Sequence, residues 1–116
     1  MKVDPSIAAV IYACLDLIGR GKEELLEAWA DSFRGNLDDV VAEIRSYPAT
    51  FRSPRAGDEV GWRLLLLAGG PWPHPTWDVA ARLPQSGGGL SDLTVRLEIV
   101  DHGDRVEVHF RDILVE

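Results

Sequence analysis

The chain has 116 residues, of which 46% are hydrophobic and 27% charged, with a formal net charge of −7 and a single cysteine. This length predicts one domain, residues 1–116, with helices over about 5–47, a loop over 48–61 and a sheet over about 62–116. The acidic balance argues against phosphate-driven binding to nucleic acid, no apolar run approaches the roughly 20 residues of a membrane span, and the lone Cys14 gives no reason to expect secretion, so we expect a cytoplasmic protein.

Three helices are predicted in the first half of the chain. Asp4-Pro5 is typical of a helix N-terminus, and apolar residues at helical spacing follow it, so the first helix is predicted over about 5–18. A second helix is predicted over about 22–34, where acidic residues come first and a basic residue comes last, in the order that the helix dipole favours. A third is predicted over about 37–46, because Asn36 can cap its start.

The second half of the chain has the pattern of β-strands separated by turns. A short apolar run at 62–67 suits either a helix or a strand, and its brevity favours a strand. The proline-rich segment 71–75 is expected to be extended, because proline excludes it from a helix. Alternation then predicts a strand over 76–83 and, after a glycine-rich connection, a hairpin formed by 93–99 and 106–110.

The register of this hairpin follows from keeping its apolar residues on one face. A two-residue turn at His102-Gly103 satisfies this condition, because glycine can supply the positive φ that such a turn needs. The predicted pairs are then Ile99 with Val106, Leu97 with Val108, Val95 with Phe110, and Glu98 with Glu107. One further pair would set Leu93 against Asp112, so we predict a β-bulge near Arg111-Asp112 that turns the following apolar residues inward.

Together these elements predict an α+β fold. Three N-terminal helices would pack on one face of a C-terminal antiparallel β-meander, which has three strands, or four if residues 62–67 join it. The apolar face of the meander needs a cover, and the amphipathic helices upstream can supply it. The polar face would then remain exposed.

Two segments of the predicted meander carry a recognisable motif. Residues 89–97 read G-L-S-D-L-T-V-R-L, and residues 111–115 read R-D-I-L-V. They resemble the end of a family of small uncharacterised bacterial proteins, a domain of unknown function with an S-D-L-T-x-x-L strand and a D-D-I-type strand, and residues 77–79 match its preceding strand. The resemblance implies the same fold over roughly residues 76–116, but no activity, cofactor or catalytic residue. Arg111 stands where that family often has an acidic residue, which argues against paired carboxylates there.

The candidate binding residues fall into two groups. The polar face of the predicted sheet and the proline-rich segment supply a partner-binding set: Trp72, Arg96, Glu98, Arg105, Glu107 and His109. A second group, Trp77, Asp92 and Asp112, could line a pocket at one end of the meander. Two close carboxylates can do acid–base work if one pKa is raised, although Asp before a strand more often serves the loop backbone.

Metal-ligating residue types gather near the hairpin turn in the sequence: Asp101, His102, Asp104 and His109. The predicted register sets His109 opposite Arg96, far from the turn, so no metal ligand is expected. The sequence has no nucleophile elbow, P-loop, dinucleotide fingerprint, HExxH or paired CxxC motif, and the three histidines have no recognisable Ser or Cys partner. These observations favour a protein that is not an enzyme and needs no cofactor.

Size, acidity, an exposed polar sheet face and the lack of catalytic motifs favour a protein-interaction module. The leading hypothesis is an immunity or antitoxin-like inhibitor whose partner is a basic toxin domain. One alternative is a ligand-binding or enzymatic domain with a pocket between helices and sheet. Another is an oligomerisation module, for example a homodimer, that pairs through an edge strand. Neither nucleic acid nor a membrane is expected as a partner.

Overall fold

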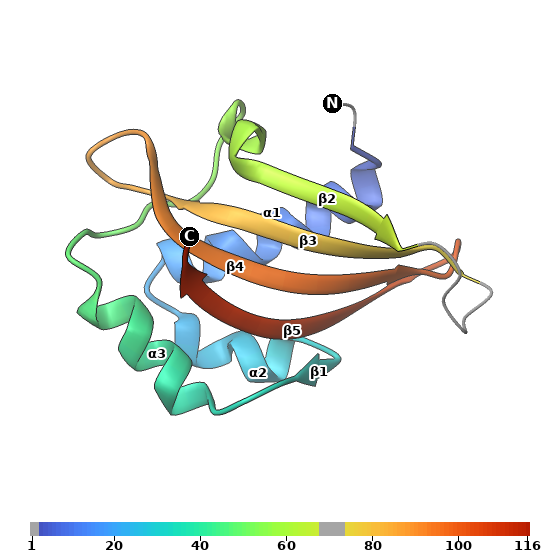
Figure 1. Cartoon of the computed structure of the whole chain (residues 1–116), viewed down its shortest axis with the longest axis horizontal. Coiled ribbons are helices and arrows are strands. Elements are labelled where there is room, and N and C mark those ends of the chain that lie inside the picture. Colours follow the sequence, from blue (N-terminus) through green and yellow to red (C-terminus); the bar gives the residue numbers. More distant parts are fainter. Residues whose placement is uncertain (1–2, 68–73) are drawn as a thin grey trace.

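The computed structural model describes residues 3–67 and 74–116, which form an α+β fold (Figure 1). In chain order the elements are α1 (Pro5–Gly19), the 3₁₀ helix η1 (Glu23–Leu25), α2 (Leu26–Trp29), β1 (Ser32–Phe33), α3 (Leu37–Ser46), the 3₁₀ helix η2 (Asp58–Gly61), β2 (Trp62–Leu67), β3 (Thr76–Pro84), β4 (Leu90–Asp101) and β5 (Val106–Val115). The strands lie in the order β1-β5-β4-β3-β2 within one sheet. The α+β class is as predicted, but the sheet has five strands and is not wholly antiparallel.

Two of the three predicted helices are confirmed, and their predicted caps explain where they begin. At the start of α1 the Asp4 carboxylate accepts a hydrogen bond from the Ser6 N–H at 2.9 Å, with Pro5 as the first helical residue. At the start of α3, Asn36 Oδ1 accepts a hydrogen bond from the Asp38 N–H at 2.8 Å. Local capping chemistry therefore sets both helix starts.

The helix predicted over 22–34 is wrong in its second half. Within this segment the helical backbone ends with α2 at Trp29. The chain then runs extended as β1, which is parallel to β5. The Arg34 N–H donates to the Phe110 carbonyl at 3.0 Å, and the Phe33 ring stacks on the Phe110 ring with centroids 4.6 Å apart. These long-range contacts override the local helical pattern, since propensity is only a weak preference. The sheet is mixed rather than antiparallel for this reason.

The other four strands form the expected antiparallel meander. The run 62–67 is the strand β2, which pairs along its whole length with β3 and lies at the edge of the sheet. The strand predicted over 76–83 is β3, one residue longer than predicted. Of the proline-rich segment, only His74 and Pro75 are described, and the candidate residue Trp72 lies outside the described residues.

The hairpin of β4 and β5 has a different register from the one predicted. The observed pairs are Asp101 with Val106, Ile99 with Val108, Glu98 with His109, and Leu97 with Phe110. The turn therefore spans the four residues 102–105, and the Asp101 carboxylate holds it by accepting a hydrogen bond from the Gly103 N–H at 2.8 Å. The two registers differ by two residues and keep the same side chains on each face, so alternation alone could not separate them.

The predicted bulge on β5 is confirmed. Arg111 is the extra residue, because pairing passes from Phe110 to Asp112 while the opposite strand advances by one residue. Beyond the bulge, Ile113 pairs with Val95 and packs against the core, as predicted. The bulge therefore restores an inward direction to the apolar residues at the end of β5.

The hydrophobic core lies between α1 and one face of the sheet, and Figure 1 shows α1 crossing behind the strands. Its buried residues on α1 are Ile7, Ile11, Cys14, Leu15 and Ile18, and those on β3, β4 and β5 include Val79, Ala81, Leu83, Leu93, Val95, Leu97, Ile99, Val108 and Phe110. No described helix lies in front of the sheet in Figure 1, so the other face, here called the open face, is uncovered. None of the described helices has the length and apolar character needed to cross a membrane.

Candidate functional site

The open face carries charged side chains that pair with one another across the strands. Arg96 on β4 binds Asp112 on β5 through two hydrogen bonds, of 2.7 Å from Nε and 2.6 Å from Nη2. The bulge residue Arg111 reaches across β4 and donates to Asp78 on β3 at 3.0 Å. Glu98 on β4 lies opposite Asp78 and forms none of the ion pairs found among the described residues. The face is therefore ordered, and one of its carboxylates has no cationic partner there.

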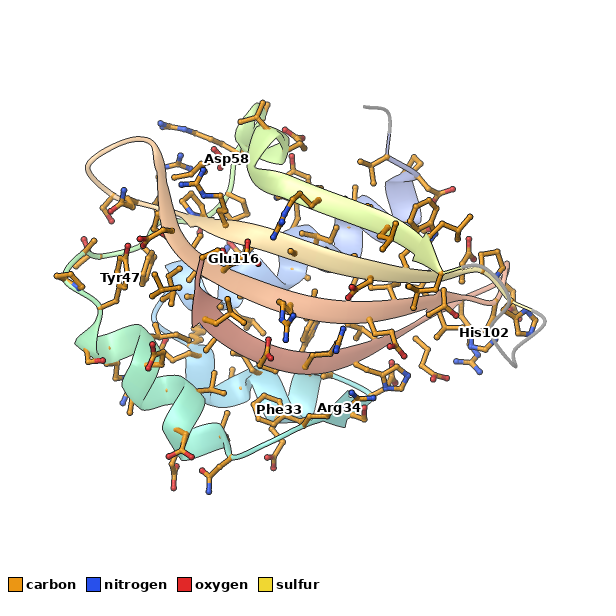
Figure 2. The ribbon with its side chains drawn as sticks, in the orientation of Figure 1. Phe33, Arg34, Tyr47, Asp58, His102 and Glu116 are labelled. Carbon is orange, nitrogen blue, oxygen red and sulfur yellow. The ribbon has the colours of Figure 1, made fainter. Side chains whose placement is uncertain are left out.

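At one end of the open face, a hollow of about 440 Å³ collects all three histidines of the chain. We call it the histidine pocket, and its lining residues are Ser32, Arg34, His74, Glu98, Val100, His102, Glu107 and His109. They come from β1 and the residue after it, from β4 and β5, from the hairpin turn and from the segment before β3. Figure 2 shows two of them, with Arg34 directly after β1 and His102 at the hairpin end of the sheet. The pocket lies outside the helix-covered core.

Glu107 is the centre of the histidine pocket. Its Oε2 lies 2.5 Å from His109 Nε2, and its Oε1 lies 3.4 Å from His102 Nε2. The His74 and His102 rings are in contact, with centroids 4.5 Å apart. Hydrogen bonding from His109 lowers the pKa of Glu107, so this carboxylate is ionised at neutral pH. His102 Nε2 is buried and forms no hydrogen bond with the described residues.

The short strand β1 adds a hydroxyl group to this cluster. Parallel pairing sets Ser32 opposite His109, and Ser32 Oγ lies 2.5 Å from His109 Nδ1. The two ring nitrogens of His109 therefore face a hydroxyl and a carboxylate. Because an ionised carboxylate can only accept, the neutral imidazole that suits this arrangement has its proton on Nε2, toward Glu107, and accepts from Ser32 at Nδ1.

The residues predicted to bind a partner or line a pocket do not include Ser32, Arg34 or His74. The first two fall within the helix predicted over 22–34, although the polar-apolar-polar order of residues 32–34 is also typical of a short edge strand. The predicted register also placed His109 far from the turn, whereas it lies two residues nearer the turn than predicted. That correction brings His109 and His102 to the same carboxylate.

The predicted partner-binding residues that are described lie on or beside the open face. Glu98, Glu107 and His109 line the histidine pocket. Arg105 lies in the hairpin turn, with Nη1 3.8 Å from Glu107 Oε1. Arg96 lies further along β4, in its pair with Asp112. The structure therefore gathers three of these residues around one hollow, whereas Arg96 and Arg105 are not among its lining residues.

The second predicted group is held by three different sets of contacts. Trp77 on β3 packs against the core, and Asp92 accepts a hydrogen bond from the Tyr47 hydroxyl. The Arg96 guanidinium lowers the pKa of Asp112 below its usual range. A carboxyl group acting as an acid near neutral pH would need the opposite shift. The shift of Asp112 is therefore opposite to the one that the acid role considered for it requires.

Comparisons with known proteins give no relative from which a function could be transferred. No family model, no curated protein and no solved structure matched the chain. The resemblance to the bacterial domain of unknown function therefore stays a prediction. Within residues 3–67 and 74–116, no group of three or more His, Cys, Asp or Glu side chains is arranged to hold a metal ion.

Proposed function

We propose that this protein is a binding module that docks on another protein through the open face of its sheet. The observation that supports this is an uncovered five-stranded surface whose charged side chains are already held in cross-strand ion pairs, as in Arg96 with Asp112 and Arg111 with Asp78. Side chains that are fixed beforehand lose less conformational freedom when a partner binds. A surface of this kind suits a small inhibitor of a larger protein.

The charge of the chain favours a basic partner. Its net charge of −7 attracts a basic surface and speeds the encounter. Glu98 lies in the histidine pocket together with the ionised Glu107 and forms no ion pair with the described residues. A Lys or Arg side chain of the partner would enter the pocket and pair with Glu98. The partner class that we propose is therefore a basic toxin domain, inhibited in the cytoplasm by an immunity or antitoxin-like protein.

Charge reversal at one pocket residue tests this proposal. The variant Glu98→Lys places a cation where the partner's cation would bind, and Glu43→Lys, on an exposed residue of α3, makes the same change away from the open face. Tagged wild-type protein and Glu43→Lys should capture one partner in a one-to-one ratio from a lysate of the source organism, and high salt should weaken the capture. Glu98→Lys should bind that partner about tenfold more weakly or worse.

Two results would contradict the proposal. One is the absence of any stoichiometric protein partner. The other is equal affinity of wild-type protein and Glu98→Lys for the captured partner, measured by titration with both proteins purified. An equal loss in Glu43→Lys would show that only overall charge matters and would also count against docking on the open face.

A further inference from the structure

Three side chains of the histidine pocket form a hydrogen-bonded chain that partner binding does not require. It runs from Ser32 through His109 to Glu107, with 2.5 Å between the bonded atoms at each step. Backbone pairing fixes its geometry, because Ser32 lies opposite His109, and Glu107 is two residues before His109 and so on the same face of β5. The Ser32 residue is exposed, whereas the His109 side chain is only 21% exposed. The hydroxyl is accessible, and the imidazole beside it is sheltered.

We propose that Ser32 is a nucleophile with His109 as its general base and Glu107 as the group that orients His109, and that the histidine pocket hydrolyses small carboxylic esters. A hydroxyl, a base and an orienting carboxylate within hydrogen-bond reach activate serine on many unrelated folds. In serine proteases the hydroxyl faces Nε2 and the carboxylate faces Nδ1, and here the two nitrogens exchange these places. Either imidazole nitrogen can transfer a proton, so the exchange preserves the chemistry.

The reaction needs only the ester and water. Ser32 Oγ attacks the carbonyl carbon while its proton moves to His109 Nδ1, and Glu107 stabilises the imidazolium that forms. The intermediate collapses by breaking the carbon–oxygen bond to the alcohol, which leaves with the proton from His109. Water then attacks the acyl group on Ser32 and gives a proton to His109. The Ser32 oxygen leaves as the carboxylic acid forms and takes that proton back.

Arg34 is placed to stabilise the negative oxygen of the intermediate. Arg34 directly follows β1, two residues after Ser32, and both residues line the pocket. Arg34 forms none of the ion pairs found among the described residues. Its guanidinium can therefore face an oxyanion that forms beside Ser32. The volume of about 440 Å³ lies in the range of small-molecule sites, which favours a small ester over a polymer.

Covalent labelling of the full chain tests this proposal. The protein is treated with a fluorophosphonate probe, the labelled residue is located by mass spectrometry, and release of p-nitrophenol from p-nitrophenyl acetate is followed in parallel. Ser32 should be labelled at least about a hundredfold faster than Ser46, an exposed serine on α3, because Ser32 has an imidazole beside it, whereas the Ser46 hydroxyl contacts a backbone carbonyl. Ser46→Ala should change neither readout. Ser32→Ala should abolish labelling and ester cleavage, and His109→Gln should slow both about a hundredfold.

The controls separate serine chemistry from other sources of activity. Histidine alone can cleave p-nitrophenyl acetate, so a wild-type rate in Ser32→Ala would overturn the proposal, as would labelling of Ser32 no faster than Ser46. Glu107→Gln keeps the size of the side chain and should slow labelling at least about tenfold, which gives a second test if His109→Gln fails to fold. A wild-type labelling rate in a folded Glu107→Gln, checked by circular dichroism, would contradict the role of Glu107. Because these readouts involve no partner protein, their failure would leave the proposed docking untouched.

Discussion

Gly19 ends α1 at a point where the helix touches the loop before β2. A Cβ added there would lie 2.4 Å from the carbonyl carbon and oxygen of Arg52 and 2.5 Å from the Ser53 nitrogen. All three are backbone atoms, which cannot turn aside as a flexible side chain can. The φ angle of Gly19 is not positive, so its backbone conformation does not require glycine. The close contact between two segments of backbone does.

Two opposing effects determine whether replacing Gly19 with alanine raises or lowers the free energy of unfolding. Alanine is favoured over glycine in a helix by about 1 kcal/mol, whereas overpacking costs about 1–3 kcal/mol, and contacts this short place the cost at the upper end. We expect Gly19→Ala to lower the free energy of unfolding by about 2 kcal/mol, measured by urea denaturation. Gly87→Ala, where a Cβ would meet nothing within 4 Å, should change it by no more than about 0.5 kcal/mol. Equal stability of the two variants would show that the contact is not a constraint.

Asp58 fixes the same loop through a buried carboxylate. It accepts hydrogen bonds of 2.9 and 3.0 Å from the Arg52 guanidinium and one of 2.8 Å from the Arg55 N–H. These bonds, led by those from Arg52, hold the pKa of Asp58 below its ordinary value of 3.8. A lowered pKa in the folded state means that the stabilisation is present above the ordinary pKa and is lost as pH falls through the folded-state value.

The variant Asp58→Asn measures this contribution and its pH dependence. At neutral pH it leaves the Arg52 guanidinium half-buried without its counter-charge, so we expect a loss of about 3 kcal/mol in the free energy of unfolding. Below pH 3.8 the carboxyl group of the unfolded wild-type chain takes up a proton, and the folded protein follows at lower pH. The difference between the two proteins should therefore shrink as the pH falls. Urea denaturation at pH 7 and at successively lower pH checks both statements. A difference that stays constant with pH would show that charge is not the cause.

At the scale of the elements, the sequence predicts most reliably what is decided locally. α1 and α3 begin at their predicted residues because one capping side chain next to each start determines them. β1 could not be predicted in this way, because a two-residue strand is held by Phe110 and the β5 backbone, far away in the chain. The same distinction explains the site. Glu98, Glu107 and His109 follow from alternation, whereas Ser32 depends on which strand lies beside it.

The bulge on β5 offers a test of how register determines the faces of the sheet. Deleting Arg111 removes the extra residue and leaves every other residue of β5 on its present face, at the cost of the partly exposed pair with Asp78. Such pairs contribute about 0.2–1 kcal/mol, so this deletion should lower the free energy of unfolding by about 1 kcal/mol or less. Ala80 lies in a regular part of β3. Deleting it moves the residues of β3 on one side of the deletion to the opposite face of the sheet, which should abolish cooperative thermal unfolding. Equal damage from both deletions would contradict this account.

At the scale of the whole molecule, two kinds of titratable group lose their stabilising effect at opposite extremes of pH. On the open face, paired carboxylates such as Glu107 and Asp112 have lowered pKa values, so their stabilisation is lost in acid. On the covered face, burial raises the pKa of Cys14 to about 12, and burial followed by hydrogen bonding to Glu59 raises the pKa of Tyr12 to about 12. A group with a raised pKa stabilises the fold below its unfolded-state pKa and loses that effect as pH rises. Stability should therefore be greatest between these two regions.

The start of the alkaline decline can be assigned to the core thiol. Cys14 has an ordinary pKa of 9.0 and Tyr12 one of 10.0, so between these two values the unfolded chain releases the thiol proton first. Each pH unit then removes up to about 1.4 kcal/mol from the free energy of unfolding, because the folded state keeps the thiol neutral in the core. Cys14→Ala should be less stable than wild type at pH 7, because it leaves a small cavity, but its stability should change much less between pH 9 and 10. Urea denaturation at both pH values measures the two slopes. Parallel slopes would show that the thiol does not titrate on unfolding and that another group causes the decline.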